Sequence, residues 1–154
     1  MPGKRERRDQ GLQLRSAGDY LLPMIEITGI DHIVLRARDP EALIAFYTGA
    51  LGLTVEKVQA RIGLTQLRAG TSLIDIVAVD GPLGRMGGAA PGAEGRNLDH
   101  VCLTVRGFDL ERVKAHLVAH GVTPGDEGLR YGAGGEGLSI YLTDPEGNGL
   151  ELRG

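Results

Sequence analysis

Two histidines and two carboxylates in this 154-residue chain combine residue types and positions that suit a metal site. His32 and His100 each follow an aspartate at the start of an apolar, strand-like run. Asp75 and Glu151 lie inside such runs, where an ionised group needs a partner, a metal ion or a wet cleft. Two imidazoles and two carboxylates suit Ni, Co, Zn, Mn or Fe(II). We therefore predict that His32, Asp75, His100 and Glu151 bind one divalent metal ion, with further positions free for water or substrate.

Strand alternation gives the two histidines equivalent directions. Residues 33, 35 and 37 form an apolar face that can pack under a helix, so His32 points to the opposite face. Residues 101, 103 and 105 give His100 the same direction. If the two halves pack with pseudo-twofold symmetry, the two histidine-bearing faces meet in one cleft. Each histidine or acid taken alone could be an ordinary strand residue, and their repeat-equivalent placement favours the metal site.

An internal repeat defines the predicted fold. Asp-His-Ile-Val-Leu at 31–35 recurs as Asp-His-Val-Cys-Leu at 99–103. Each copy precedes a helix, capped by Asp39 with Pro40 in the first half and by Asp109 in the second, and each helix is expected to end near a glycine, Gly52 or Gly121. Three strand-like runs follow each helix, at 53–58, 64–68 and 72–79 and then near 122–130, 138–142 and 149–152. We predict an α+β fold in which two βαβββ modules form a curved mixed sheet with a cleft.

Composition sets the expected boundaries of the two modules. The first module spans 24–80 and the second 98–154, and a linker rich in Gly, Ala and Pro joins them at 81–97. Residues 1–23 hold five Lys/Arg and three Asp/Glu without periodicity, so we expect a flexible basic leader. The alternative is that the true start of the chain is Met24, where the periodic sequence begins.

Charge and cysteine content narrow the classes of function. The formal charge is −3 and aromatic residues make up 4% of the chain, without a basic stripe, so we expect no nucleic-acid partner. The single cysteine rules out an internal disulfide and suits a cytoplasmic location. No apolar run reaches the length needed to span a bilayer, so we expect no membrane partner. Cys102 shares a face with His100, and we interpret it as a small apolar filler.

Five motifs resemble the vicinal oxygen chelate superfamily, which includes glyoxalase I, extradiol dioxygenases and bleomycin resistance proteins. They are His-x-x-Leu-Arg from 32, Asp-Pro-Glu-Ala from 39, Phe-Tyr-x-x-x-Leu-Gly-Leu from 46, Leu-Asp-His-Val from 98 and Asp-Pro-Glu-Gly-Asn-x-x-Glu-Leu from 144. The resemblance covers Thr28 to Arg153. It is specific for fold and metal position, whereas the superfamily supports several reactions on one scaffold.

Within the superfamily, the chain is most similar to glyoxalase I. That resemblance implies the four ligands named above, although Asp75 stands where the family has Glu or Gln. It also implies that Arg36 and Arg96 bind a substrate carboxylate. The implied reaction is a lyase-type isomerisation of a small α-oxo substrate, such as a hemithioacetal thiol adduct, through a metal-stabilised enediolate. Glu151 would remove the carbon-bound proton and Asp75 would return it, and we expect a homodimer.

Two alternatives stay open at this stage. The short side chain of Asp75 could lie outside the metal's reach, which leaves the two-histidine, one-carboxylate site of an Fe(II) dioxygenase. A non-catalytic small-molecule or antibiotic-binding resistance protein is the second alternative. The sequence also leaves open whether the metal site forms within one chain or between two.

Overall fold

Each half of the chain forms strands and one helix in the predicted βαβββ order. The computed structural model describes residues 25–154, so the expected basic leader at 1–23 lies outside the described residues. The first half contains β1 (His32–Ala37), α1 (Pro40–Gly49), β2 (Thr54–Gln59), β3 (Leu64–Ala69) and β4 (Ser72–Ala78). The second half contains β5 (His100–Thr104), α2 (Leu110–Ala119), β6 (Glu127–Gly132), β7 (Gly135–Thr143) and β8 (Gly149–Arg153).

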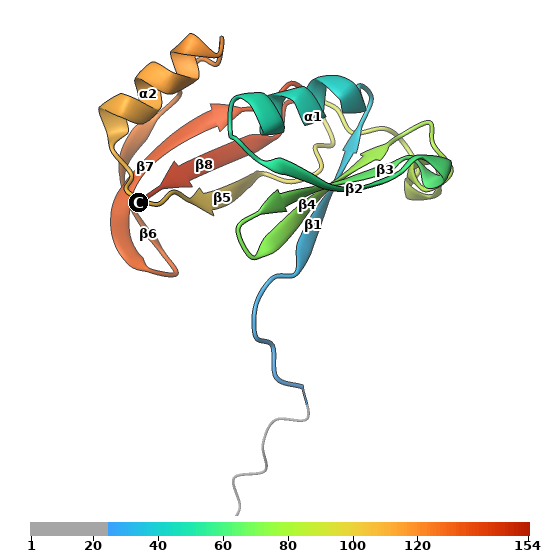
Figure 1. Cartoon of the computed structure of the whole chain (residues 1–154), viewed down its shortest axis with the longest axis horizontal. Helices are drawn as coiled ribbons and strands as arrows, with labels where there is room; N and C mark the ends of the chain where they lie inside the picture. The colour runs from blue at the N-terminus through green and yellow to red at the C-terminus, as the bar shows by residue number, and fades with distance from the viewer. Residues whose placement is uncertain (1–24) are drawn as a thin grey trace, which may run out of the picture.

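The strands build two four-stranded mixed sheets of identical topology, which confirms the predicted α+β fold. The strand orders are β1-β4-β3-β2 and β5-β8-β7-β6. In each sheet the first strand pairs in parallel with the fourth, and the other neighbours are antiparallel. In Figure 1 both helices lie along the upper side of the sheets, which leaves the opposite faces open.

The predicted capping residues start both helices. The Asp39 side chain accepts a hydrogen bond from the backbone N–H of Ala42 at 2.9 Å, and Pro40 occupies the first turn. The Asp109 side chain does the same for the backbone N–H of Arg112 at 2.9 Å. Each cap satisfies a backbone donor that the helix itself leaves free. Gly52 and Gly121, which follow the helices, adopt positive φ angles of 70° and 71°.

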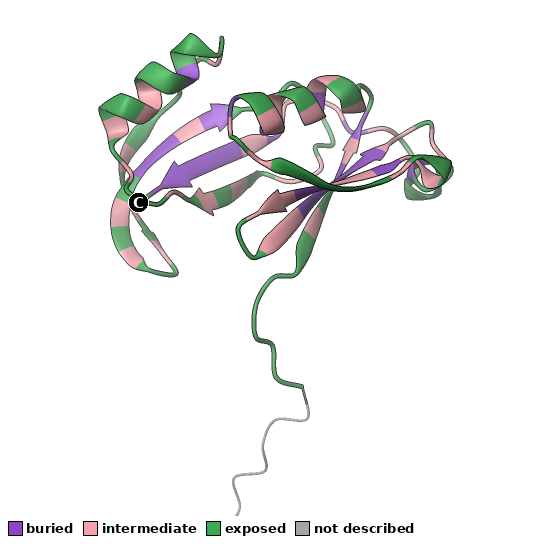
Figure 2. Cartoon of the chain, in the orientation of Figure 1, coloured by how far each residue is buried: buried purple, intermediate pink, exposed green. Residues whose placement is uncertain are grey.

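One hydrophobic core joins the two modules on the helix side of the sheets. Its buried members come from both halves of the chain: Leu35, Ala37, Leu43, Tyr47, Leu67, Ile74, Ile76, Leu117, Ile140, Leu142, Leu150 and Leu152. Figure 2 shows buried residues along β7 and β8. The fully buried Tyr47 of α1 donates its hydroxyl to Asp144, in the turn between β7 and β8, at 3.2 Å. The modules therefore meet through α1 and this turn.

The segment between the modules is anchored by Arg36 of β1. The Nη atoms of Arg36 donate to the backbone carbonyls of Gly84, Gly87, Gly88 and Ala89, each at 2.9 Å. Two of these residues, Gly84 and Gly87, are the ends of the short helix η2 (Gly84–Gly87). Asn97 continues the connection, because it exchanges hydrogen bonds of 3.0 Å with the backbone of Arg36 and donates to Asn148 at 3.1 Å. One strand residue thus ties the linker to the first sheet.

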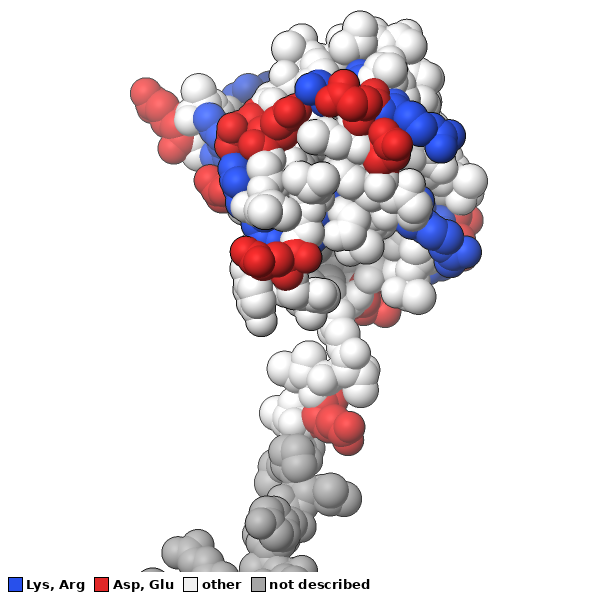
Figure 3. All heavy atoms as spheres, turned by 90° about the vertical axis from the view of Figure 1, so that its left-hand side faces the viewer, with Lys and Arg blue, Asp and Glu red and all other residues white. Residues whose placement is uncertain are grey.

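Figure 3 shows one side of the molecule, whose surface carries both positive and negative side chains. Basic and acidic side chains are interspersed on that side of the molecule rather than gathered by sign. Within residues 25–154, no helix is long and apolar enough to cross a membrane.

Candidate metal centre

His100 and Glu151 form a close pair on the open face of the second sheet. They come from neighbouring strands, because β5 pairs with β8 and Cys102 stands opposite Glu151. His100 Nε2 lies 3.5 Å from Glu151 Oε2. Glu151 is only 6% exposed, although it lies outside the apolar core. This pair provides one imidazole and one carboxylate at a distance that a single ion can bridge.

Three further polar groups surround the Glu151 carboxylate. The hydroxyl groups of Ser139 and Tyr141, both on β7, donate hydrogen bonds to the Glu151 carboxylate. The bond from Tyr141 is 3.2 Å long. Burial by itself raises the pKa of Glu151, but hydrogen bonds from Ser139, Tyr141 and Cys102 and the nearby His100 outweigh it, so the pKa is lowered. Glu151 is therefore ionised at neutral pH, as a metal ligand or a general base must be.

Asp75 and His32 form the corresponding pair on the first sheet. Asp75 is 5% exposed, and it stands opposite Val34 on β1 and Gln66 on β3. The Gln66 amide donates to both carboxylate oxygens of Asp75 at 3.1 Å. The hydrogen bond that His32 makes to the Asp31 carboxylate raises the pKa of His32, desolvation opposes that shift, and the charge of Asp75 adds to it. Asp75 thus influences His32 electrostatically while Gln66 holds its carboxylate.

Both histidines are oriented by the aspartate that precedes them. His32 Nδ1 lies 2.7 Å from Asp31 Oδ1, and His100 Nδ1 lies 2.7 Å from Asp99 Oδ2. A carboxylate on one ring nitrogen fixes the tautomer and leaves the other nitrogen as a donor to metal. The same device in both modules explains why the Asp-His pair recurs in the sequence.

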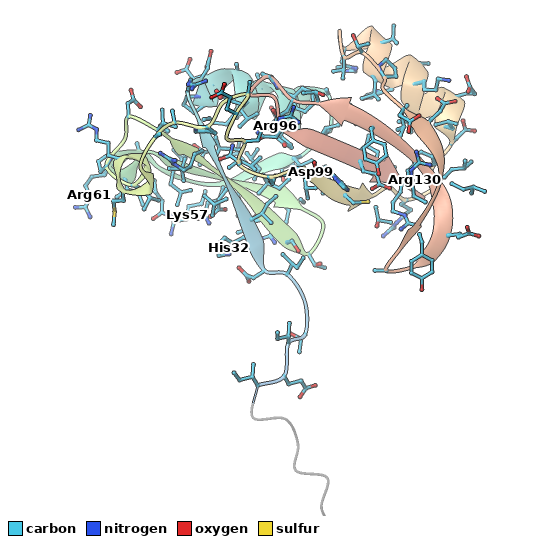
Figure 4. All side chains as sticks on the ribbon, turned by 180° about the vertical axis from the view of Figure 1, so that it is seen from behind. His32, Lys57, Arg61, Arg96, Asp99 and Arg130 are labelled. Carbon is cyan, nitrogen blue, oxygen red and sulfur yellow. The ribbon has the colours of Figure 1, made fainter. Side chains whose placement is uncertain are left out.

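The donor set fits a divalent ion, but one chain does not bring all four donors together. In the part of the chain that the structure describes, no three His, Cys, Asp or Glu side chains come close enough to hold a metal. Figure 4 shows His32 at the start of β1 and Asp99 at the start of β5, on different sheets. Among the described residues, the structure therefore groups the predicted ligands as two pairs, and their joint binding of one ion stays a prediction. The core joins the modules on the helix side, so the open faces stay apart.

The two arginines expected to bind substrate have different surroundings. The Nη atoms of Arg36 donate to the four linker carbonyls described above, so they are not free to bind a substrate carboxylate. Arg96 is exposed on the linker before β5, and Figure 4 shows it near the junction of the two sheets. The structure thus gives Arg36 a structural role that the sequence pattern did not reveal.

Several residues around the pairs were not predicted from the sequence. Ser139 and Tyr141 stand two apart on β7, so alternation alone places them on one face. Only the pairing of Tyr141 with Glu151 in the sheet brings that face to the carboxylate. Gln66 reaches Asp75 through the β3–β4 register in the same way. A register prediction for the two hairpins would have been the signal that found them.

A comparison with protein families decides the classification. The model of the Glyoxalase/Bleomycin resistance protein/Dioxygenase superfamily matches residues 29–152. The chain belongs to this superfamily. The match spans both modules and both His–acid pairs, and it confirms the family resemblance seen in the sequence motifs.

Solved structures of the same architecture support the assignment. An integron cassette protein from the mobile metagenome of V. cholerae is 26% identical, with a TM-score of 0.67 over 84% of this chain and 97% of that one. A virulence protein from Salmonella typhimurium is also 26% identical, with a TM-score of 0.69 over 84% and 98%. A lactoylglutathione lyase from Agrobacterium tumefaciens is 20% identical, with a TM-score of 0.60 over 82% and 93%, which shows a shared fold.

Proposed function

We propose that this superfamily member is a divalent-metal-dependent lyase of glyoxalase I type, with each site built from two copies of the chain. His32 and Asp75 of one copy would face His100 and Glu151 of the other. The observation that carries the proposal is the matched pair of half-sites, each with an aspartate-oriented histidine and a buried carboxylate. Neither half-site offers enough donors alone, and a symmetric dimer would complete two sites at once.

The proposed substrate is a small α-oxo compound, such as the hemithioacetal of a thiol and methylglyoxal. A divalent ion in the completed site would act as a Lewis acid toward two neighbouring oxygen atoms of the substrate. Glu151 would remove the proton from the carbon that carries the hemithioacetal hydroxyl, since its lowered pKa keeps it ionised. Asp75 of the second copy, in its protonated form, would deliver a proton to the adjacent carbon, and the proton taken up by Glu151 would pass back to Asp75 through water, which restores both groups. The overall change is an isomerisation, so it needs no oxidant or reductant.

The residues around Glu151 have defined tasks in this scheme. Ser139 and Tyr141 hold the carboxylate in one orientation by donating to different oxygens. Asp99 holds the ring of His100 so that Nε2 faces Glu151. Fixed orientation matters because a proton can be removed only when donor and acceptor lie within hydrogen-bond reach.

Metal content and turnover together test the proposal. The purified protein should retain about one divalent ion per chain, since two copies complete two sites, and should convert methylglyoxal plus glutathione to a thioester. Glu151→Gln should lower the rate roughly a hundredfold or more, as expected for a group that acts in the transition state. The matched control is Glu136→Gln, an exposed glutamate on β7, which should keep the wild-type rate. A fully active Glu151→Gln protein, or full activity after exhaustive chelation, would disprove the lyase mechanism.

The environment of Asp75 favours one alternative. Because the Gln66 amide occupies both Asp75 oxygens, the metal could instead be held by His32, His100 and Glu151 alone. Such a two-histidine, one-carboxylate site is typical of Fe(II) oxygenases. Asp75→Asn that keeps the metal, together with ring cleavage of catechol under Fe(II), would support the dioxygenase over the lyase. Metal loss in Asp75→Asn would support the four-ligand site.

A further inference from the structure

Arg153 is a buried cation beside the second half-site. It is 6% exposed, and it follows Glu151 by two positions on β8. Leu150 and Leu152 belong to the core, so strand alternation directs Glu151 and Arg153 to the open face. The sheet register places Thr104 of β5 and Ser139 of β7 on either side of Arg153. The residue therefore shares the face that carries the proposed metal ligands.

A glycine-rich hairpin supports the Arg153 guanidinium. Its Nη2 atom donates to the backbone carbonyl of Gly135 at 2.6 Å and approaches that of Arg130 at 3.3 Å. A Cβ atom at Gly132 would overlap Nη1, and one at Gly137 would lie 2.8 Å from Nη2. The guanidinium thus packs against the β6–β7 hairpin at two positions that lack side chains.

The charge of Arg153 has no acidic partner in the described part of the chain. None of the ion pairs formed within residues 25–154 includes it, whereas the neighbouring Arg130 pairs with Asp126 at 2.6 Å. Nε and Nη1 make no hydrogen bond within that range, and neither atom is wholly shut off from solvent. An arginine stays charged, and a buried charge without a counter-ion is costly. A ligand that supplies an anion would remove this cost.

We propose that Arg153 binds an anionic group of the substrate, which deepens the function proposed above and rests on it. Two residues along a strand span about 7 Å, so this group would lie several bonds away from the oxygens near Glu151. The substrate class is then an α-oxo or α-hydroxy compound that carries a separate carboxylate or similar anion. A guanidinium can bind such a group through two hydrogen bonds, and Thr104 stands opposite Arg153 in the sheet.

Arg153 suits this task better than the arginines predicted from the sequence. The Nη atoms of Arg36 are already engaged with four carbonyls of the linker. Arg96 is exposed on the linker, where an anion would have to compete with water. Of these three arginines, only Arg153 combines burial, unused donors and a position on the strand that holds Glu151.

Calorimetric titration of the metal-free protein with malonate, compared with the neutral malonamide, tests the assignment. The wild type should bind malonate and not malonamide. Arg153→Met should weaken malonate binding at least tenfold. Arg112→Met, which removes an exposed arginine from α2 on the opposite side of the sheet, should leave it unchanged. If circular dichroism shows Arg153→Met unfolded, Arg153→Lys should still weaken binding severalfold, because an ammonium lacks the two-pronged geometry.

Equal malonate affinity in the wild type and the folded Arg153 variants would overturn the assignment, as would a wild type that does not discriminate malonate from malonamide. Metal content of the wild-type protein, measured before the metal is removed for the titration, separates this result from the proposed function. Arg153-dependent malonate binding without any metal binding would overturn the proposed lyase function only. Metal binding with malonate affinity independent of Arg153 would overturn the anion site only.

Discussion

A site shared between two copies makes a quantitative prediction about mixed dimers. His32→Ala damages the first half-site of a chain, and His100→Ala damages the second. In a dimer of one His32→Ala chain and one His100→Ala chain, both lesions fall in the same shared site. The other site is then composed only of wild-type halves. The mixed dimer should therefore hold about half the metal and show about half the activity of the wild type.

The experiment requires differently tagged chains, co-expressed and purified through both tags, with metal content and turnover measured on the product. Each homodimer should hold less metal than the wild type, because every one of its sites lacks one imidazole. The matched control joins His100→Ala to Glu151→Gln. His100 and Glu151 both belong to the second half-site of their own chain. Each shared site uses the second half-site of one chain, so each of the two sites carries one of the two substitutions and no intact site remains.

The reasoning fails if the His32→Ala and His100→Ala mixed dimer recovers nothing, since an intra-chain site predicts that result. Recovery in the control dimer would equally refute it, because no arrangement of shared halves gives that combination an intact site. A wild-type protein that retains metal as a monomer in gel filtration would refute the shared site directly.

Three further predictions concern single residues outside this test. Cys102 is exposed, and its pKa is raised to about 11, first by desolvation and then by the charge of Glu151. In metal-free protein at pH 8, the Cys102 thiol should therefore react with a thiol reagent about two hundredfold more slowly than free cysteine. A reaction rate like that of free cysteine would contradict this prediction. Tyr47→Phe removes the buried hydrogen bond to Asp144 and should lower the free energy of unfolding in urea by about 1.5 kcal/mol, whereas an unchanged midpoint would show that this bond adds no stability. Arg36→Ala should lower the unfolding free energy by about 3 kcal/mol and speed proteolysis of the linker, because four carbonyls lose their donor; a linker that stays protected would mean that Arg36 does not anchor it.

Local features of the fold were predictable because they depend on near neighbours in the chain. The caps at Asp39 and Asp109 act within three residues, and the structure has both helices where these caps place them. Strand alternation assigned His32 and His100 to the faces away from the helices. The Asp-Pro-Glu-Gly turn before β8 also forms, with the N–H of Gly147 bonded to the carbonyl of Asp144 at 3.0 Å.

Partners that come from distant strands were not predictable in the same way. Arg36 was expected to bind substrate, yet it meets carbonyls about fifty positions away. Ser139 and Tyr141 reach Glu151 only through the β7–β8 register. In the sequence, Arg153 is an ordinary charged residue near the end of a strand. The structure shows that it is buried against the glycine-rich β6–β7 hairpin.

By itself, the sequence determined the two βαβββ modules, the superfamily and the four candidate ligands, because repeats, caps and alternation are short-range properties. Only the tertiary structure decided how those ligands are distributed. The apolar core and the Tyr47–Asp144 contact join the modules through their helix sides, so the faces that carry the His–acid pairs remain separate within one chain. Packing between distant segments, which no local pattern encodes, therefore decides which of the predicted ligands lie near one another within one chain.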